Sequence, residues 1–151
     1  MVSIESDPRS PNPNPACVDA HDRVVGTQVW LWQCFGPDHA NQRWIRTAEM
    51  QFILADTKGS SRELCMDGGS GTERSLVTIQ VCRSGAANQK WDMLGTGSGE
   101  LQLQDSHKLC LTAPNESNAN GNLLILDACH PTVLGGQRWS YRDPRGVATA
   151  G

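Results

Sequence analysis

A tripeptide returns three times at a nearly constant interval along this 151-residue chain. Gln42-Arg43-Trp44, Gln89-Lys90-Trp91 and Gln137-Arg138-Trp139 begin 47 and 48 residues apart. Two cysteines precede each copy; the pairs are Cys17 and Cys34, Cys65 and Cys82, and Cys110 and Cys129. A period of this length indicates a threefold internal repeat. Because one unit so short cannot bury its own apolar face, the three copies are expected to share one core.

Equivalent cysteines should pair in equivalent ways, so the repeat favours disulfides 17–34, 65–82 and 110–129 among the fifteen pairings that six cysteines allow. Regularly spaced disulfides indicate an oxidising compartment, either outside the cell or in the secretory-pathway lumen. Zinc is the competing use of cysteine. It prefers cysteines separated by two to four residues, whereas the closest pair here is 17 apart. We expect no metal and no cofactor.

The net charge of −3 and a pI near 5.7 argue against a nucleic-acid partner, which would require a basic surface. The sequence contains no run of 18 apolar residues, so it predicts no membrane-spanning helix. Residues 1–6 lack the basic and apolar regions of a signal peptide. Taken with the cysteines, this suggests a mature form or a module excised from a longer chain.

Short alternating runs bounded by Gly, Pro, Asn and Ser predict an all-β fold, and no useful stretch has a helical apolar period. Strands are expected before each second cysteine, at 27–34, 77–82 and 123–129, and at the start of each repeat, at 2–4, 52–54 and 101–103. We expect a single domain whose repeats span residues 1–47, 48–95 and 96–142, with a loop at 7–15 and a tail at 143–151.

Alternate side chains of a strand face opposite sides, so the strands before the second cysteines can be divided into two faces. The residues expected to face the core are Val29, Leu31, Val77, Ile79, Val81, Leu124, Leu126 and Ala128. Those expected to face outward are Trp30, Trp32, Thr78, Gln80, Ile125 and Asp127. The inward set repeats and the outward set does not, so the core should be symmetric and the surface specialised. Two outward tryptophans in repeat one indicate a contact surface.

The runs Cys17-Val18-Asp19, Leu31-Trp32-Gln33-Cys34 and Asn41-Gln42-Arg43-Trp44, with their echoes in the other repeats, resemble the ricin B-type lectins, the QxW β-trefoils. The resemblance covers about residues 1–142. It implies three four-stranded repeats around a pseudo-threefold axis, with six strands in a barrel and six in a cap. It also implies non-catalytic binding of glycans that contain galactose or N-acetylgalactosamine (GalNAc). The QxW tryptophan is a core residue in that family.

The family's sugar site uses the Asp two residues after the first cysteine, an aromatic two before the second, and the Asn-Gln that opens QxW. Repeat one matches throughout, with Asp19, Trp32, Asn41 and Gln42. A tryptophan ring can stack on the apolar face of galactose. An ionised aspartate accepts strongly from hydroxyls, and an asparagine both donates and accepts. Gln42 either contacts the sugar or holds its neighbours.

Three further residues of repeat one flank this set. Trp30 either extends the aromatic platform to a second sugar ring or packs against a loop. His21 and His39 either add a hydrogen bond or are solvated loop residues.

The other two repeats depart from the pattern. Repeat two keeps Asp67, Asn88 and Gln89, but Gln80 replaces the aromatic, which suggests a weak second site or a structural network. Repeat three has Thr112, Asp127 and Gly136 at the key positions and is expected to be structural. Its Asn115-Glu116-Ser117 triplet is a glycosylation sequon.

No catalytic constellation is present: there is no glycosidase-type carboxylate pair, no nucleophile elbow and no free cysteine. We therefore expect a binding domain and not an enzyme. A module of a glycoside hydrolase, a glycosyltransferase or a toxin, with xylan as a ligand, remains an alternative. So does a trefoil that acts on a protein partner, as an inhibitor or in the manner of a cytokine, through Trp30 and Trp32.

Overall fold

We describe residues 1–6, 14–36, 38–95, 101–130 and 135–142 of a computed structural model of the chain. This part forms twelve strands and five single-turn 3₁₀ helices, which confirms the all-β prediction. The strands are β1 (Ser3–Ser6), β2 (Ala16–Asp19), β3 (Trp30–Gln33), β4 (Trp44–Arg46), β5 (Phe52–Leu54), β6 (Leu64–Asp67), β7 (Thr78–Val81), β8 (Trp91–Gly95), β9 (Leu101–Asp105), β10 (Leu109–Thr112), β11 (Ile125–Ala128) and β12 (Trp139–Arg142). The 3₁₀ helices are η1 (Ala40–Gln42), η2 (Ala55–Thr57), η3 (Ala87–Gln89), η4 (Pro114–Glu116) and η5 (Gly135–Gln137). Within these residues, no helix has the length and apolar character needed to cross a membrane.

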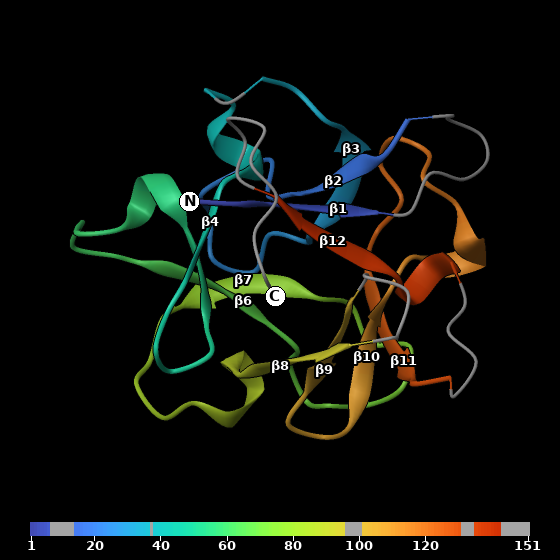
Figure 1. Ribbon diagram of the computed structural model, residues 1–151. Helices are drawn as coiled ribbons and strands as arrows, with labels where there is room; N and C mark the ends of the chain where they lie inside the picture. Colours follow the sequence, from blue (N-terminus) through green and yellow to red (C-terminus); the bar gives the residue numbers. More distant parts are fainter. Residues whose placement is uncertain (7–13, 37, 96–100, 131–134, 143–151) are drawn as a thin grey trace.

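The strands pair antiparallel in two sheets. One has eight strands, in the order β11-β10-β9-β12-β1-β2-β3 with β8 attached to β9, and the other has the order β4-β5-β6-β7. β1 pairs with β12, so the two ends of the described chain lie side by side (Figure 1). Single bridges then join the repeats in a ring: Gln28 to Thr78, Leu76 to Ile125, and Trp30 to Leu123. The three repeats surround one axis, as expected for a β-trefoil.

The QxW tryptophans lie at the centre of this arrangement. Trp44, Trp91 and Trp139 are at most 1% exposed and belong to one apolar core built from all three repeats. Each indole N–H donates to the backbone carbonyl of the residue after the first cysteine; the acceptors are Val18, Met66 and Leu111, at 3.1, 3.1 and 3.0 Å. The predicted core role is confirmed, and each tryptophan also ties the QxW motif to the opening strand of its hairpin.

The three disulfides form as predicted, at 17–34, 65–82 and 110–129. The strands before the second cysteines are shorter than expected and run from 30 to 33, 78 to 81 and 125 to 128. Of the expected opening strands, the one at 52–54 is confirmed, while the others extend to residues 6 and 105. The tail at 143–151 and most of the loop at 7–15 lie outside the described residues.

Three of the inward and outward assignments are wrong. Val81 is 41% exposed and Ala128 is exposed, although both were expected to face the core. Each is the residue before a second cysteine, where the strand has already passed the edge of the core. Ile125 is only 9% exposed, although it was expected to point outward, because its backbone forms the bridge to Leu76 of the neighbouring repeat.

Replacing Trp91 with Phe should lower the free energy of unfolding by about 1–3 kcal/mol. The substitution leaves the Met66 carbonyl without its donor and opens a cavity in a fully buried site. Urea denaturation of both proteins measures this difference. The matched control is Trp32→Phe, at a half-buried position, which should cost well under about 1 kcal/mol. Equal losses for the two variants would contradict the central role of the QxW tryptophan.

Candidate functional site

The glutamine that opens each QxW motif is buried and uses both ends of its amide. Gln42 is 0% exposed; its Oε1 accepts the Phe35 N–H and its Nε2 donates to the Gln33 carbonyl, each at 3.0 Å. Gln89 makes the same pair of bonds with Arg83 and Val81, and Gln137 with His130 and Ala128. This pair of hydrogen bonds fixes the loop that follows each second cysteine.

The same amide group also holds the residue two after the first cysteine. Gln42 Nε2 lies 2.9 Å from Asp19 Oδ2, Gln89 Nε2 lies 3.1 Å from Asp67 Oδ2, and Gln137 reaches Thr112 Oγ1 at 3.2 Å. Of the two roles expected for Gln42, its complete burial favours positioning Asp19 over contact with a ligand.

Asp19 ends β2 with a side chain that is only 3% exposed. Its Oδ1 accepts the indole N–H of Trp30 at 3.2 Å, and His39 Nε2 lies 3.9 Å from Oδ2. Burial raises the pKa of this carboxyl above its ordinary value, and hydrogen bonds from Gln42 and Trp30 and the charge of nearby histidines offset only part of that rise. A buried carboxylate with few donors is suited to accept further hydrogen bonds from a ligand.

Trp30, which donates to Asp19, belongs to a group of aromatic rings. Trp30 and Trp32 are half-buried on β3, with ring centroids 5.2 Å apart and planes inclined by 31°. The imidazole of His21 lies 4.0 Å from the Trp30 ring. Trp30 is therefore held by His21, Trp32 and Asp19, which agrees with the local-packing alternative. Gly121 of repeat three lies beside both indoles; a Cβ placed there would be 3.9 Å from each.

The loop after Cys34 forms the opposite rim. The rings of Phe35 and His39 lie 4.6 Å apart with their planes inclined by 56°, and Arg43 donates to the backbone carbonyls of Phe35 and Gly36. A cleft of about 370 Å³ is lined by Phe35, Gly36, Asp38 and His39. His39, which lies 3.9 Å from Asp19, forms part of this lining.

Asn41 lies on η1 and is half-buried. Its backbone carbonyl accepts the Ala20 N–H at 2.9 Å, which ties η1 to the end of β2. Its side-chain amide has no hydrogen-bond partner within the described residues. One donor and one acceptor therefore remain available close to Asp19.

Repeat two differs in how its polar groups are used. Asp67 Oδ1 accepts the Gly69 N–H at 2.7 Å and the Asn88 side-chain amide at 2.9 Å, in addition to the bond from Gln89 to Oδ2. Three protein donors therefore surround this carboxylate, and Asn88 is occupied. With Gln80 in place of the aromatic, this arrangement favours the structural network over a second site.

Repeat three holds a feature that the sequence reasoning missed. A cavity of about 380 Å³ lies where repeat one has its aromatic cluster, lined in part by Thr112, Asp127 and Gly136. The available signal was the small volume of Asp127 and Gly136 relative to Trp32 and Asn41 of repeat one.

Comparison with known proteins places this geometry in a family. The profile described as "Ricin-type beta-trefoil lectin domain" matches residues 9–139, so the chain belongs to that family, whose fold binds carbohydrate without catalysis. Among solved structures, a designed threefold-symmetric protein, ThreeFoil, superimposes with a TM-score of 0.74 at 19% identity, covering 94% of this chain and 98% of that one. The C-half of an earthworm R-type lectin in complex with GalNAc gives 0.68 at 16% identity, covering 93% and 96%. These structures confirm the β-trefoil.

Curated relatives also match the chain. N-acetylgalactosaminyltransferase 4 of Drosophila melanogaster is 25% identical over 91 residues, which are 60% of this chain. The chain spans only 14% of the length of that protein.

Asp19→Asn should change how stability depends on pH. The pKa of Asp19 is raised in the folded protein above its ordinary value of 3.8. At a pH just above 3.8, the folded chain therefore still holds a proton on Asp19 that the unfolded chain has released. Stability of the wild type should therefore fall as the pH rises from about 3.8 through the higher folded pKa, and the neutral variant should lack this contribution. Urea denaturation of both proteins from about pH 3 to about pH 7 gives the difference. A difference that moves in favour of the wild type as the pH rises would show that this pKa is lowered.

Proposed function

We propose that this domain binds glycans containing galactose or N-acetylgalactosamine through repeat one. The observation that supports the proposal is that Asp19 bonds to Trp30, which lies 5.2 Å from the Trp32 ring, while the backbone of Asn41, whose side chain is uncommitted, bonds to Ala20. Repeat two lacks the aromatic and has a saturated aspartate, and repeat three lacks both the aspartate and the asparagine. The GalNAc bound to the earthworm lectin supports the choice of sugar.

The proposed mode follows from the residue types. The apolar face of the sugar stacks on Trp32, and its neighbouring hydroxyls donate to Asp19 and exchange hydrogen bonds with Asn41. Gln42 positions Asp19 through its amide, and His39 Nε2 lies 3.9 Å from the carboxylate. Because Asp19 is almost fully covered, a sugar hydroxyl takes the place of the Trp30 N–H as the indole moves aside.

A single shallow site of this kind should bind weakly, with a Kd of roughly 10⁻³ to 10⁻⁵ M. Useful avidity then needs a second site, an oligomer or a partner domain. The similarity to the fly transferase supports a role as the lectin module of a longer enzyme, and the three disulfides support a secreted or lumenal location.

Asp19→Asn and Trp32→Ala should each weaken binding of galactose or GalNAc by about tenfold or more, since hydrogen bonds to a charged group contribute about 1.5–3 kcal/mol and the stacking platform is lost. Isothermal titration with the free sugars measures the effect. The counterparts Thr112→Val and Gln80→Ala serve as controls and should change affinity less than about twofold. Normal sugar binding by both repeat-one variants would refute the site. A protein contact built on the tryptophans would instead survive Asp19→Asn.

Trp30→Phe tests whether the indole covers Asp19 or forms part of the platform. The variant should bind galactose at least as tightly as the wild type and up to about tenfold more tightly, because the bond to be broken contributes about 0.5–1.5 kcal/mol. The same titration is repeated with a galactose-containing disaccharide. A loss as large as that of Trp32→Ala would mean that Trp30 itself contacts the first sugar ring.

A further inference from the structure

The cavity in repeat three is the feature that the proposed function leaves unused. Its volume of about 380 Å³ falls within the roughly 300–1,000 Å³ typical of small-molecule pockets. The space exists because Ile125 stands where repeat one has Trp30, and Asp127 where it has Trp32. Repeat one is filled by two indoles, whereas the matching place in repeat three is hollow.

This pocket lacks the residues that suit a neutral galactose unit. Thr112 stands at the aspartate position, and its hydroxyl already donates to the Cys110 carbonyl at 2.8 Å and accepts from Gln137 at 3.2 Å. Gly136 stands at the asparagine position, where a Cβ would lie 2.6 Å from the Ala113 carbonyl oxygen, so a larger residue does not fit. A ligand here must have a different chemistry from that of repeat one.

Arg74 provides that different chemistry. It belongs to repeat two, and its backbone N–H donates to the Leu126 carbonyl of repeat three at 2.7 Å. Gly26 and Gly121 make the equivalent bonds in the other repeats, at 2.8 Å each, with φ of 92° and 86°. Arg74 adopts the same left-handed conformation, with φ of 67°. Glycine adopts this conformation without steric cost, whereas an arginine adopts it at a cost. The chain therefore carries a strained arginine at a position where its other two repeats have glycine.

Backbone strain is concentrated around this pocket. Five non-glycine residues of the described chain have positive φ, and three of them, Arg74, Asn115 and Glu116, line the cavity. Residues in such conformations cluster at functional sites. Their gathering here indicates a pocket shaped for a ligand.

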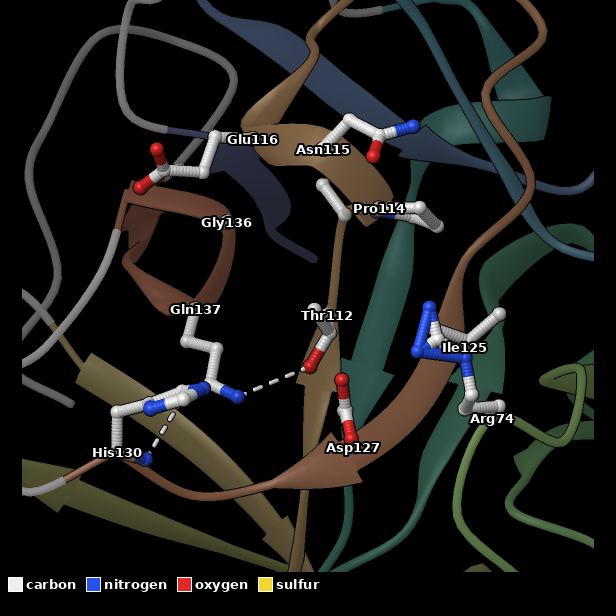
Figure 2. A pocket seen from close by; sticks show the side chains of 11 residues that line it. Arg74, Thr112, Pro114, Asn115, Glu116, Ile125, Asp127, His130, Gly136 and Gln137 are labelled. Carbon is white, nitrogen blue, oxygen red and sulfur yellow. Dashed lines mark hydrogen bonds between the residues drawn. The ribbon is translucent and has the colours of Figure 1, made fainter.

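The charges of the pocket are separated in space. Figure 2 shows Arg74 beside Ile125 at one side, Glu116 and His130 at the other, and Asp127 between them. Arg74 is exposed, and within the described residues its guanidinium makes no ion pair or hydrogen bond. One oxygen of Asp127 accepts a backbone N–H at 2.9 Å, and the other has no partner in the same part of the chain. The pocket therefore offers the planar guanidinium of Arg74 as a cation and, at a separate place, the carboxylate of Asp127 as a strong hydrogen-bond acceptor.

We propose that the repeat-three pocket binds an acidic sugar unit, with Arg74 holding its anionic group and Asp127 accepting its hydroxyls. A guanidinium pairs with a carboxylate or a sulfate through two parallel hydrogen bonds, and a carboxylate accepts from sugar hydroxyls. The proposal is independent of the site in repeat one, because the two share no residue.

The test uses protein produced in bacteria, so that Asn115 at the pocket rim carries no glycan. An Asp19→Asn background weakens the site in repeat one. Galacturonic acid, galactose 6-sulfate and galactose are titrated separately, and ¹⁵N NMR follows the Arg74 side-chain signal. The Kd of at least one anionic probe should be about tenfold or more below that of galactose, and the preferred probe tells carboxylate from sulfate.

Arg74→Gly should abolish the preference for the anionic probe, and it should leave the urea midpoint unchanged or raise it, because glycine suits the positive φ. Arg62→Ala removes the same charge from an exposed site and should bind as the parent does. Arg74→Lys keeps the charge without the fork and should retain part of the affinity. The proposal fails if all three probes bind equally, or if Arg74→Gly binds the anionic probe as tightly as its parent. The same titrations in the wild-type background guard against a folding defect in Asp19→Asn.

Discussion

The structure depends on the hydrogen bonds that the QxW glutamine and tryptophan make inside the fold. In each repeat the tryptophan N–H reaches the carbonyl of the residue after the first cysteine, and the glutamine amide joins the end of the next strand to the loop that follows it. These donors and acceptors are buried, so losing one leaves an unsatisfied partner at a cost of about 1–3 kcal/mol. Three distant segments of a repeat are thereby held together by two side chains that contribute nothing to the outer surface. The surface residues can then change without loss of the fold.

That separation explains what was predictable from the sequence. The 47- and 48-residue period, the disulfide pairing and the core role of Trp44 follow from residues that recur, and all three are confirmed. The errors fall where the alternation of side chains along a strand is overridden by the position of the strand in the whole fold. Alternation assigns Val81 to the core, but the strand has passed the core by that point. It assigns Ile125 to the outside, but a bridge to Leu76 buries it. Neither the end of the core nor the neighbouring repeat is visible in a run of six residues.

The residues of the candidate site were easier to predict than their burial and hydrogen bonding. The family pattern selects Asp19, Trp32 and Asn41 as the proposed sugar site. The family pattern does not reveal that the Trp30 indole donates a hydrogen bond to Asp19 or that Asp19 is almost fully buried. An indole N–H is a donor without a charge, so it satisfies the carboxylate only in part, and desolvation still raises the pKa. In repeat two, three protein donors surround the equivalent carboxylate of Asp67. One aspartate is therefore left short of donors and the other is saturated.

Each outer site is also built by two repeats, which a repeat-by-repeat comparison of the sequence overlooks. The strand before a second cysteine pairs with a segment of the neighbouring repeat, and a residue with positive φ begins that segment. In repeat one this residue is Gly121, which leaves the two indoles uncovered on that side. In repeat three it is Arg74, which brings a guanidinium to a pocket with no aromatic platform. Together with the loss of the two indoles, a position in the adjoining repeat can thus supply ion pairing where repeat one offers stacking. Three copies of one frame can therefore present surfaces of different chemistry without any change in the core that supports them.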